Sequence, residues 1–151
     1  MTPSSVRAWL LELGGDRLAA VALHELVEVL SRPRRFHVPL AYPTCHEVIV
    51  WRDEILPVVD LRPAAGSATR TGAASVTAVA AYQLAPGQRV RHGAVELNAM
   101  PKTIEVSDEM SCPPPGSGEP LGALALACFS YQNLPVPVVD LARLFEEGPA
   151  A

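Results

Sequence analysis

Residues 57–61 read Pro-Val-Val-Asp-Leu, and the same five residues recur at 137–141 in a chain of 151 residues. Each copy begins in an apolar, β-branched run that is typical of a strand. Each copy also ends with Asp-Leu, followed by residues that are compatible with a helix. The repeat therefore predicts two similar halves, each with a strand that leads into a short helix.

The spacing of apolar residues along the rest of the chain predicts a mainly β protein. Residues 32–43 and 110–120 are rich in proline and are expected to form loops. The expected strands are 7–13, 18–23, 26–30, 48–51, 55–61, 76–84, 90–97, 121–129 and 134–141, and a short helix is expected at 142–147. The turns expected between strands are 14–16, 52–54, 86–88 and 131–133.

The segment 64–74 consists largely of Ala, Gly, Ser and Thr, which is typical of a joint between two structural units. We therefore expect a single domain, 1–151, built from two small units. The first would span roughly 7–63 together with the C-terminal segment, and the second roughly 75–141.

Composition limits the possible functions. Hydrophobic residues make up 49% of the chain and aromatic residues only 5%, so an aliphatic core is expected. The formal net charge is −4, and no basic cluster alternates with aromatic residues, which argues against nucleic-acid binding. No apolar run approaches the roughly 20 residues that cross a bilayer, and the first residues do not resemble a signal peptide. A cytoplasmic protein without membrane insertion is expected.

The recurring aspartates, Asp60 and Asp140, suggest two chemical roles. Two halves that each donate one carboxylate could form an aspartate-dependent hydrolase. However, the small Gly-containing loop that such enzymes place around the aspartate is missing here. An aspartate before a first helical turn is instead typical of an N-cap, whose oxygen accepts hydrogen bonds from free backbone N–H groups. We favour structural caps at both positions.

Other catalytic and metal-binding patterns are weak. The histidines and cysteines are scattered, and the only close pair, Cys45 and His46, would point to opposite faces of a strand. No nucleophile elbow and no glycine-rich phosphate loop is present. The three cysteines, Cys45, Cys112 and Cys128, are odd in number and widely spaced, which favours reduced thiols. The sequence therefore predicts no enzyme, no metal and no cofactor.

One charged pair has a plausible geometry. Glu28 lies on an expected strand, and Arg52 lies at the tip of the expected hairpin before Pro57. Opposite charges on neighbouring strands attract each other. The alternative is that Arg52 is simply a solvated turn residue.

These residues resemble the CheW-like domain family, the coupling scaffold of bacterial chemotaxis and of related pilus-motility arrays. The strand 26–29 and the prolines Pro39 and Pro43 match its first half. The long motif at 48–61 matches in Arg52, Ile55, Pro57, Val58, Asp60 and Leu61. The chain departs from the family pattern at three positions, Glu47, Val50 and Asp53. Of these, Val50 replaces an asparagine and Asp53 a glycine.

The resemblance implies two five-stranded β-barrels side by side with short helices, and a non-enzymatic adaptor that is a monomer in isolation. Its partners would be the regulatory domain of a CheA-type histidine kinase and the cytoplasmic tip of a chemoreceptor, in chemotaxis or type IV pilus signalling. The alternative is a divergent module that has lost receptor coupling and serves another assembly. The candidate partner-binding residues are Glu28, Val50, Trp51, Arg52 and Asp53, with Trp51 either a core residue or an interface anchor.

Overall fold

The computed structural model of the chain describes residues 4–38, 47–62, 65 and 76–147. It is mainly β, as predicted, with one seven-residue α-helix at the C-terminal end of the described part. The strands are β1 (Ser5–Glu12), β2 (Leu18–Ala22), β3 (Leu26–Leu30), β4 (Arg35–His37), β5 (Glu47–Trp51), β6 (Glu54–Asp60), β7 (Val76–Tyr82), β8 (Arg91–Leu97), β9 (Lys102–Ser107), β10 (Ala125–Tyr131) and β11 (Leu134–Val139). Three single-turn 3-10 helices, η1 (Leu23–Glu25), η2 (Asp108–Met110) and η3 (Gly122–Leu124), and the helix α1 (Leu141–Glu147) complete the elements.

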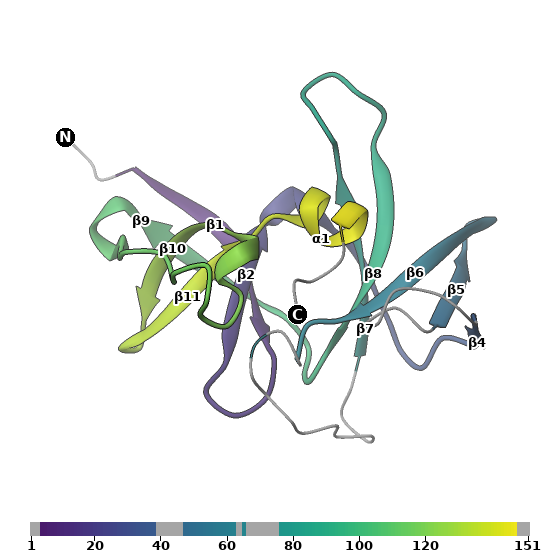
Figure 1. The fold of residues 1–151 in the computed structure, drawn as a ribbon, viewed down its shortest axis with the longest axis horizontal. Helices are drawn as coiled ribbons and strands as arrows, with labels where there is room; N and C mark the ends of the chain where they lie inside the picture. Colours follow the sequence, from purple (N-terminus) through teal and green to yellow (C-terminus); the bar gives the residue numbers. More distant parts are fainter. Residues whose placement is uncertain (1–3, 39–46, 63–64, 66–75, 148–151) are drawn as a thin grey trace.

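The strands form two sheets that lie side by side, as Figure 1 shows. A five-stranded sheet has the order β10-β11-β2-β1-β9, and a six-stranded sheet has the order β3-β7-β8-β6-β5-β4. The expected units, roughly 7–63 with the C-terminal segment and roughly 75–141, would divide the strands near 64–74, but the observed sheets do not divide them there. The N-terminal hairpin β1–β2 joins the C-terminal strands, while β3 to β6 share the other sheet with β7 and β8.

The repeated pentapeptide has the same place in both sheets. The first copy lies on β6, which pairs in parallel with β8, and the second lies on β11, which pairs in parallel with β2. The second copy leads directly into α1, as predicted. After the first copy, residues 61, 62 and 65 form a turn. The rest of the helix expected there falls outside the described residues.

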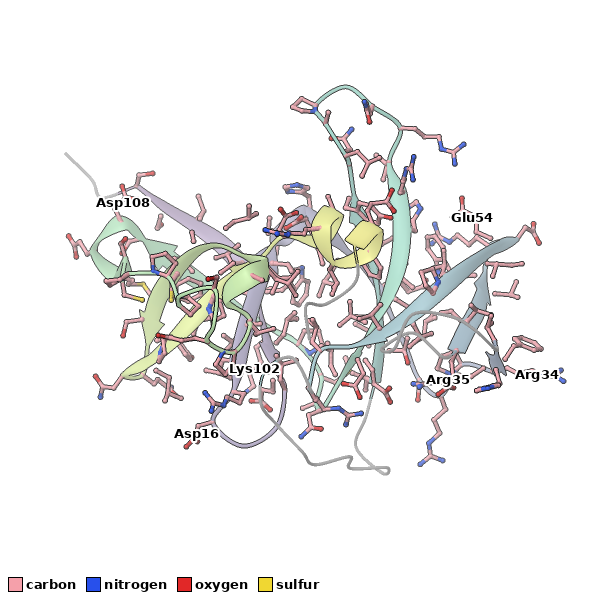
Figure 2. The ribbon with its side chains drawn as sticks, viewed as in Figure 1. Asp16, Arg34, Arg35, Glu54, Lys102 and Asp108 are labelled. Atoms are coloured by element: carbon pink, nitrogen blue, oxygen red, sulfur yellow. The ribbon has the colours of Figure 1, made fainter. Side chains whose placement is uncertain are left out.

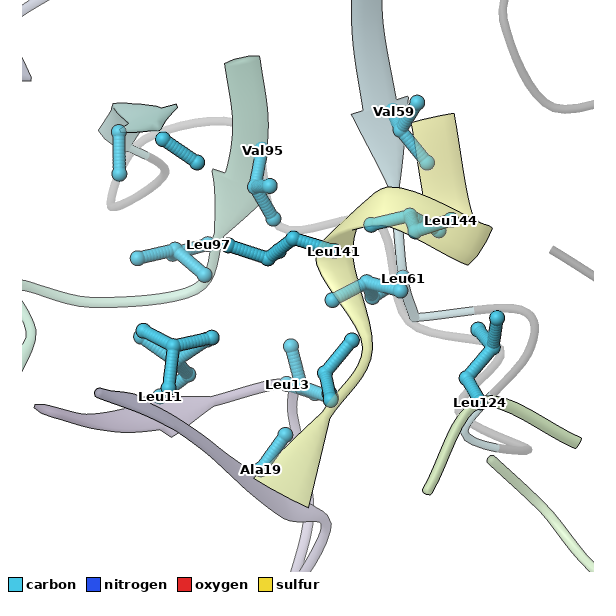
Figure 3. Close-up of a cluster of buried hydrophobic side chains, with 14 of the residues drawn as sticks. Leu11, Leu13, Ala19, Val59, Leu61, Val95, Leu97, Leu124, Leu141 and Leu144 are labelled. Atoms are coloured by element: carbon cyan, nitrogen blue, oxygen red, sulfur yellow. The ribbon is translucent and has the colours of Figure 1, made fainter. Parts of the chain in front are cut away.

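The main core joins the two sheets through α1. Figure 3 shows Leu11, Leu13 and Ala19 of the five-stranded side meeting Val95 and Leu97 of the other sheet, with Leu141 between them, and Leu144 belongs to the same cluster. Phe145 of α1 lies directly on β8, where a Cβ at Gly93 would overlap its ring. Because only glycine leaves room for this ring, Gly93 fixes how closely α1 approaches the sheet.

Three elements differ from the prediction. Strand β4 forms within the expected loop 32–43, because Phe36 pairs with Val48 and the prolines lie outside the paired residues. Strand β9, which pairs with β1, was not predicted, although Thr103 to Val106 alternate in a way that suits a strand. The strand expected at 121–129 begins only at Ala125, because η3 precedes it.

The two sheets also join their outer edges differently. In the five-stranded sheet, the segment after β9 reaches the opposite edge through a backbone bridge between Ser111 and Phe129 of β10. In the six-stranded sheet, side chains connect β3 and β4, at the two edges, to strands on the far side. Glu28 of β3 contacts β5, and Arg35 of β4 contacts β7 and β8.

Candidate protein-binding surface

The candidate surface is built on the hairpin of β5 and β6. Its two-residue turn consists of Arg52 and Asp53, both with positive φ, 48° and 64°, and Trp51 faces Glu54 across it. A turn with two left-handed residues matches the twist of a hairpin and favours Asn, Asp and Gly. This geometry explains why Asp53 can stand where the family pattern has glycine.

Successive side chains of a strand point to opposite sides, so the hairpin has an inner and an outer face. The inner face carries Ile49, Trp51, Leu56 and Val58, which form a buried cluster with Val79 and Ala94. The outer face of β4, β5 and β6 is also apolar but lies open to solvent. We call it the β4–β6 face, and it consists of Phe36, Val48, Val50, Ile55 and Pro57.

The β4–β6 face is continuous because its members stand opposite one another in the sheet. Val48 lies between Phe36 and Pro57, and Val50 faces Ile55. Phe36 is 41% exposed, Val50 58% and Ile55 73%. Large apolar side chains that gather in this way on a surface commonly mark a site of protein contact.

Trp51 belongs to the core rather than to this face. It is only 7% exposed and lies against His92, with a distance of 5.0 Å between the ring centroids. Its indole Nε1 donates a 2.8 Å hydrogen bond to Glu28 Oε2, and the Arg52 guanidinium covers its ring at 4.5 Å. Of the two roles considered from sequence, the structure gives Trp51 the role of a core residue that supports the turn.

Glu28 and Arg52 are brought together as the sequence suggested. Arg52 Nη2 lies 3.7 Å from Glu28 Oε1, and the two side chains are 67% and 40% exposed, respectively. An exposed pair of this kind contributes at most about 1 kcal/mol. The Glu28 carboxylate therefore acts mainly as acceptor for the buried indole, and Arg52 presents its charge at the rim of the β4–β6 face.

A second polar cluster lies at the other end of the six-stranded sheet, and sequence reasoning missed it. Arg35 donates to both Glu96 oxygens at 3.1 and 3.2 Å and to the Thr77 hydroxyl at 3.0 Å. The buried Arg62 guanidinium lies 3.7 Å from Glu96. Nothing in the spacing of Arg35 and Glu96 along the chain pointed to this contact, since 60 residues separate them.

The two repeated aspartates, Asp60 and Asp140, have different structural roles. Asp60 accepts hydrogen bonds from the backbone N–H and the guanidinium of Arg62, all at 2.9 Å, and this carboxylate raises the pKa of Arg62. Asp140 accepts a 3.2 Å bond from the Arg143 N–H at the start of α1, which is the geometry of an N-cap. Asp60 therefore anchors a buried arginine, whereas Asp140 caps a helix.

The described residues contain no group of three or more His, Cys, Asp or Glu side chains arranged to hold a metal ion. In the same part of the chain, no helix has the length and apolar character needed to span a bilayer.

Comparison with known proteins agrees with the fold. The family model of the CheW-like domain matches residues 7–147. The crystal structure of the scaffolding protein TtCheW from Thermoanaerobacter tengcongensis superposes with a TM-score of 0.78 over 97% of this chain and 96% of that one, at 19% sequence identity. No curated protein matches the sequence.

Proposed function

Since the chain belongs to the CheW-like domain family, we propose that it is a cytoplasmic, non-enzymatic adaptor that couples a chemoreceptor-like sensor to a CheA-type histidine kinase. The signalling array would serve chemotaxis or type IV pilus motility. The observation that carries this proposal is the β4–β6 face, an apolar surface on a rigid hairpin whose inner side is fully packed.

The rim of this face has the composition of an interface. Arg52 lies at the turn, and the exposed Arg34 lies over the Phe36 ring at 5.2 Å. Figure 2 labels Arg34, Arg35 and Glu54 on this side of the molecule. An apolar centre with arginines at the margin is typical of protein-binding surfaces.

The occupant we propose for the β4–β6 face is the regulatory domain of the kinase, which has the same fold in the family that this chain resembles. A partner for a face rimmed by Arg34 and Arg52 is expected to present an apolar patch with acidic residues at its margin. Contact there would leave the five-stranded sheet free for the receptor tip. The adaptor would thus hold both partners at once.

Such an adaptor couples receptor and kinase by holding them in a fixed position relative to each other. A receptor change can shift the kinase equilibrium only if the contacts through the adaptor differ between the two kinase states. The packed core that joins the two sheets through α1 supports this role, because it would transmit the position of one face to the other.

The experiment reconstitutes the array from the purified chain, the kinase and the receptor cytoplasmic fragment of the same host. Kinase autophosphorylation is measured with and without each component. We expect receptor control of the kinase only when the chain is present. If the chain binds neither partner and leaves kinase activity unchanged, the proposal is wrong.

A second candidate is a divergent scaffold without receptor coupling. It is favoured by Val50, which is 58% exposed where the family pattern has asparagine, so the surface chemistry of the hairpin has changed. In the reconstitution, this candidate predicts that the chain binds the kinase domain but leaves the kinase insensitive to the receptor.

A further inference from the structure

Two of the three cysteines lie next to each other at the point where the five-stranded sheet joins its edges. Cys112 follows Ser111, which forms the backbone bridge to Phe129 of β10, and Cys128 precedes Phe129 on that strand. The Cys112 N–H donates a 3.0 Å hydrogen bond to the Cys128 carbonyl oxygen. The two residues therefore lie opposite each other beside this antiparallel bridge and are joined by one backbone hydrogen bond.

The side chains of this pair are in contact. The two Sγ atoms lie 3.0 Å apart, and both thiols are free. Directly opposed residues of antiparallel strands have Cα atoms about 4.5–5.5 Å apart. Disulfides typically span Cα distances of about 4.4–6.8 Å, so the backbone is already placed for a bond.

The two thiols differ in how accessible they are to solvent and small reagents. Cys128 is 5% exposed, and burial, together with the hydrogen bond to Cys112, raises its pKa to about 12. Cys112 is only half-buried and is the thiol that a small reagent can reach. The pair thus has an accessible sulfur and a protected one at contact distance.

We propose that Cys112 and Cys128 are a reversible thiol–disulfide site, oxidised by low-molecular-weight disulfides. This goes beyond the adaptor function and does not depend on it.

The reaction proceeds in two exchanges. The Cys112 thiolate, having lost its proton to solvent, attacks the small disulfide RSSR, which breaks its S–S bond, forms Cys112–S–SR and releases RS⁻. The Cys128 sulfur then attacks Cys112 Sγ, gives its proton to the departing sulfur and releases RSH. The two cysteine sulfurs are oxidised, and RSSR is reduced to two thiols.

The bond would fix the closure of the five-stranded sheet. It would link the β9 side to β10 covalently, where one backbone bridge and one backbone hydrogen bond already connect the two segments. It would also tether Pro113 to Pro115, which directly follow Cys112. These prolines line a cavity of about 650 Å³ together with Leu18 and Pro137. Oxidation would therefore hold one wall of this cavity in place.

The test uses the full chain with Cys45→Ser, so that only the proposed pair can react. The protein is treated with oxidised glutathione and digested without reduction by chymotrypsin, which cleaves after leucine as well as after aromatic residues. Because Leu121 and Leu124 lie between the two cysteines and neither precedes a proline, the oxidised pair holds two peptides together, at about two mass units less than their sum. Dithiothreitol should separate them.

Thermal unfolding gives the second readout. The oxidised protein should unfold on the order of 5–10 °C above the reduced one, because the bond restricts the unfolded chain. The same treatment of Cys112→Ser in this background should leave the midpoint unchanged, and this half-buried site tolerates the smaller hydroxyl. Cys128→Ala provides the same control from the other side.

Three results would overturn the proposal. These are a stable glutathione adduct on Cys112 without linked peptides, a covalent dimer in place of the internal bond, and an internal bond that lowers the midpoint.

Discussion

The two sheets of this protein join their edges by different means. The five-stranded sheet uses backbone groups, through Ser111 and Phe129 and the hydrogen bond between Cys112 and Cys128. The six-stranded sheet uses side chains, through Glu28 with Trp51 at one end and Arg35 with Glu96 and Thr77 at the other. Backbone groups are the same in nearly all residues, so the contact between the edges of the five-stranded sheet can form with many different side chains. The contacts in the six-stranded sheet instead depend on the identity of a few residues.

The contacts that depend on particular side chains therefore lie in the six-stranded sheet, beneath the β4–β6 face. The residues that hold the six-stranded sheet together also support the hairpin that presents Val50 and Ile55. Substitutions in these side chains should therefore affect stability more than comparable changes in the five-stranded sheet.

The largest loss of stability is expected for substitutions of Trp51. Trp51→Ala removes a buried indole from the inner cluster and should lower the free energy of unfolding by about 3–5 kcal/mol. Trp51→Phe keeps most of the packing but loses the bond to Glu28, with a cost of about 1–2 kcal/mol. Urea unfolding of both variants measures this. An unchanged midpoint in Trp51→Ala would show that the side chain lies outside the core.

The next effect is expected at Glu96. Glu96→Ala leaves Arg35 and the buried Arg62 without a shared carboxylate and should cost about 2–3 kcal/mol, less than for a fully buried pair because Arg35 is partly exposed. The matched control is Glu12→Ala, which breaks the exposed pair with Lys102 in the five-stranded sheet and should cost under about 0.5 kcal/mol. Equal losses in the two variants would contradict the distinction between the sheets.

The smallest effect is expected at the turn. Arg52→Ala should lower the free energy of unfolding by under about 0.5 kcal/mol, because its pair with Glu28 is exposed. Glu28→Ala should cost about 1 kcal/mol, because the Trp51 indole also loses its acceptor. A double-mutant cycle of Glu28 and Arg52 gives their coupling energy. Coupling well above that of an exposed pair would mean that Arg52 contributes more than a rim charge.

Much of the fold was predictable because it follows from local patterns. The β5–β6 hairpin, the turn at 131–133 and α1 follow from alternation, turn residues and a short helical run. The separation of the β1–β2 hairpin from β3 to β6, which join β7 and β8 in the other sheet, was not predictable, since sequence periodicity carries no information on which strands pair.

The candidate site was predictable in part. The resemblance at 48–61 drew attention to the hairpin that carries most of the β4–β6 face, and the pairing of Glu28 with Arg52 is present. The apolar continuity of the β4–β6 face was missed, because Phe36 lies in a segment expected to be a loop. The contact of Cys112 with Cys128 was missed as well, because it depends on a bridge made by a proline-rich segment.

If the β4–β6 face binds the kinase regulatory domain, as we propose, a single charge placed on this face should weaken the complex. The most direct test is a calorimetric titration of that purified domain with the chain, with Ile55→Glu and with Val6→Glu. Ile55 and Val6 are 73% and 63% exposed and lie on different sheets, so both variants should fold like the wild type. We predict that Ile55→Glu weakens binding by about 10-fold or more while Val6→Glu binds normally. Wild-type affinity in Ile55→Glu, or an equal loss in both variants, would contradict the account.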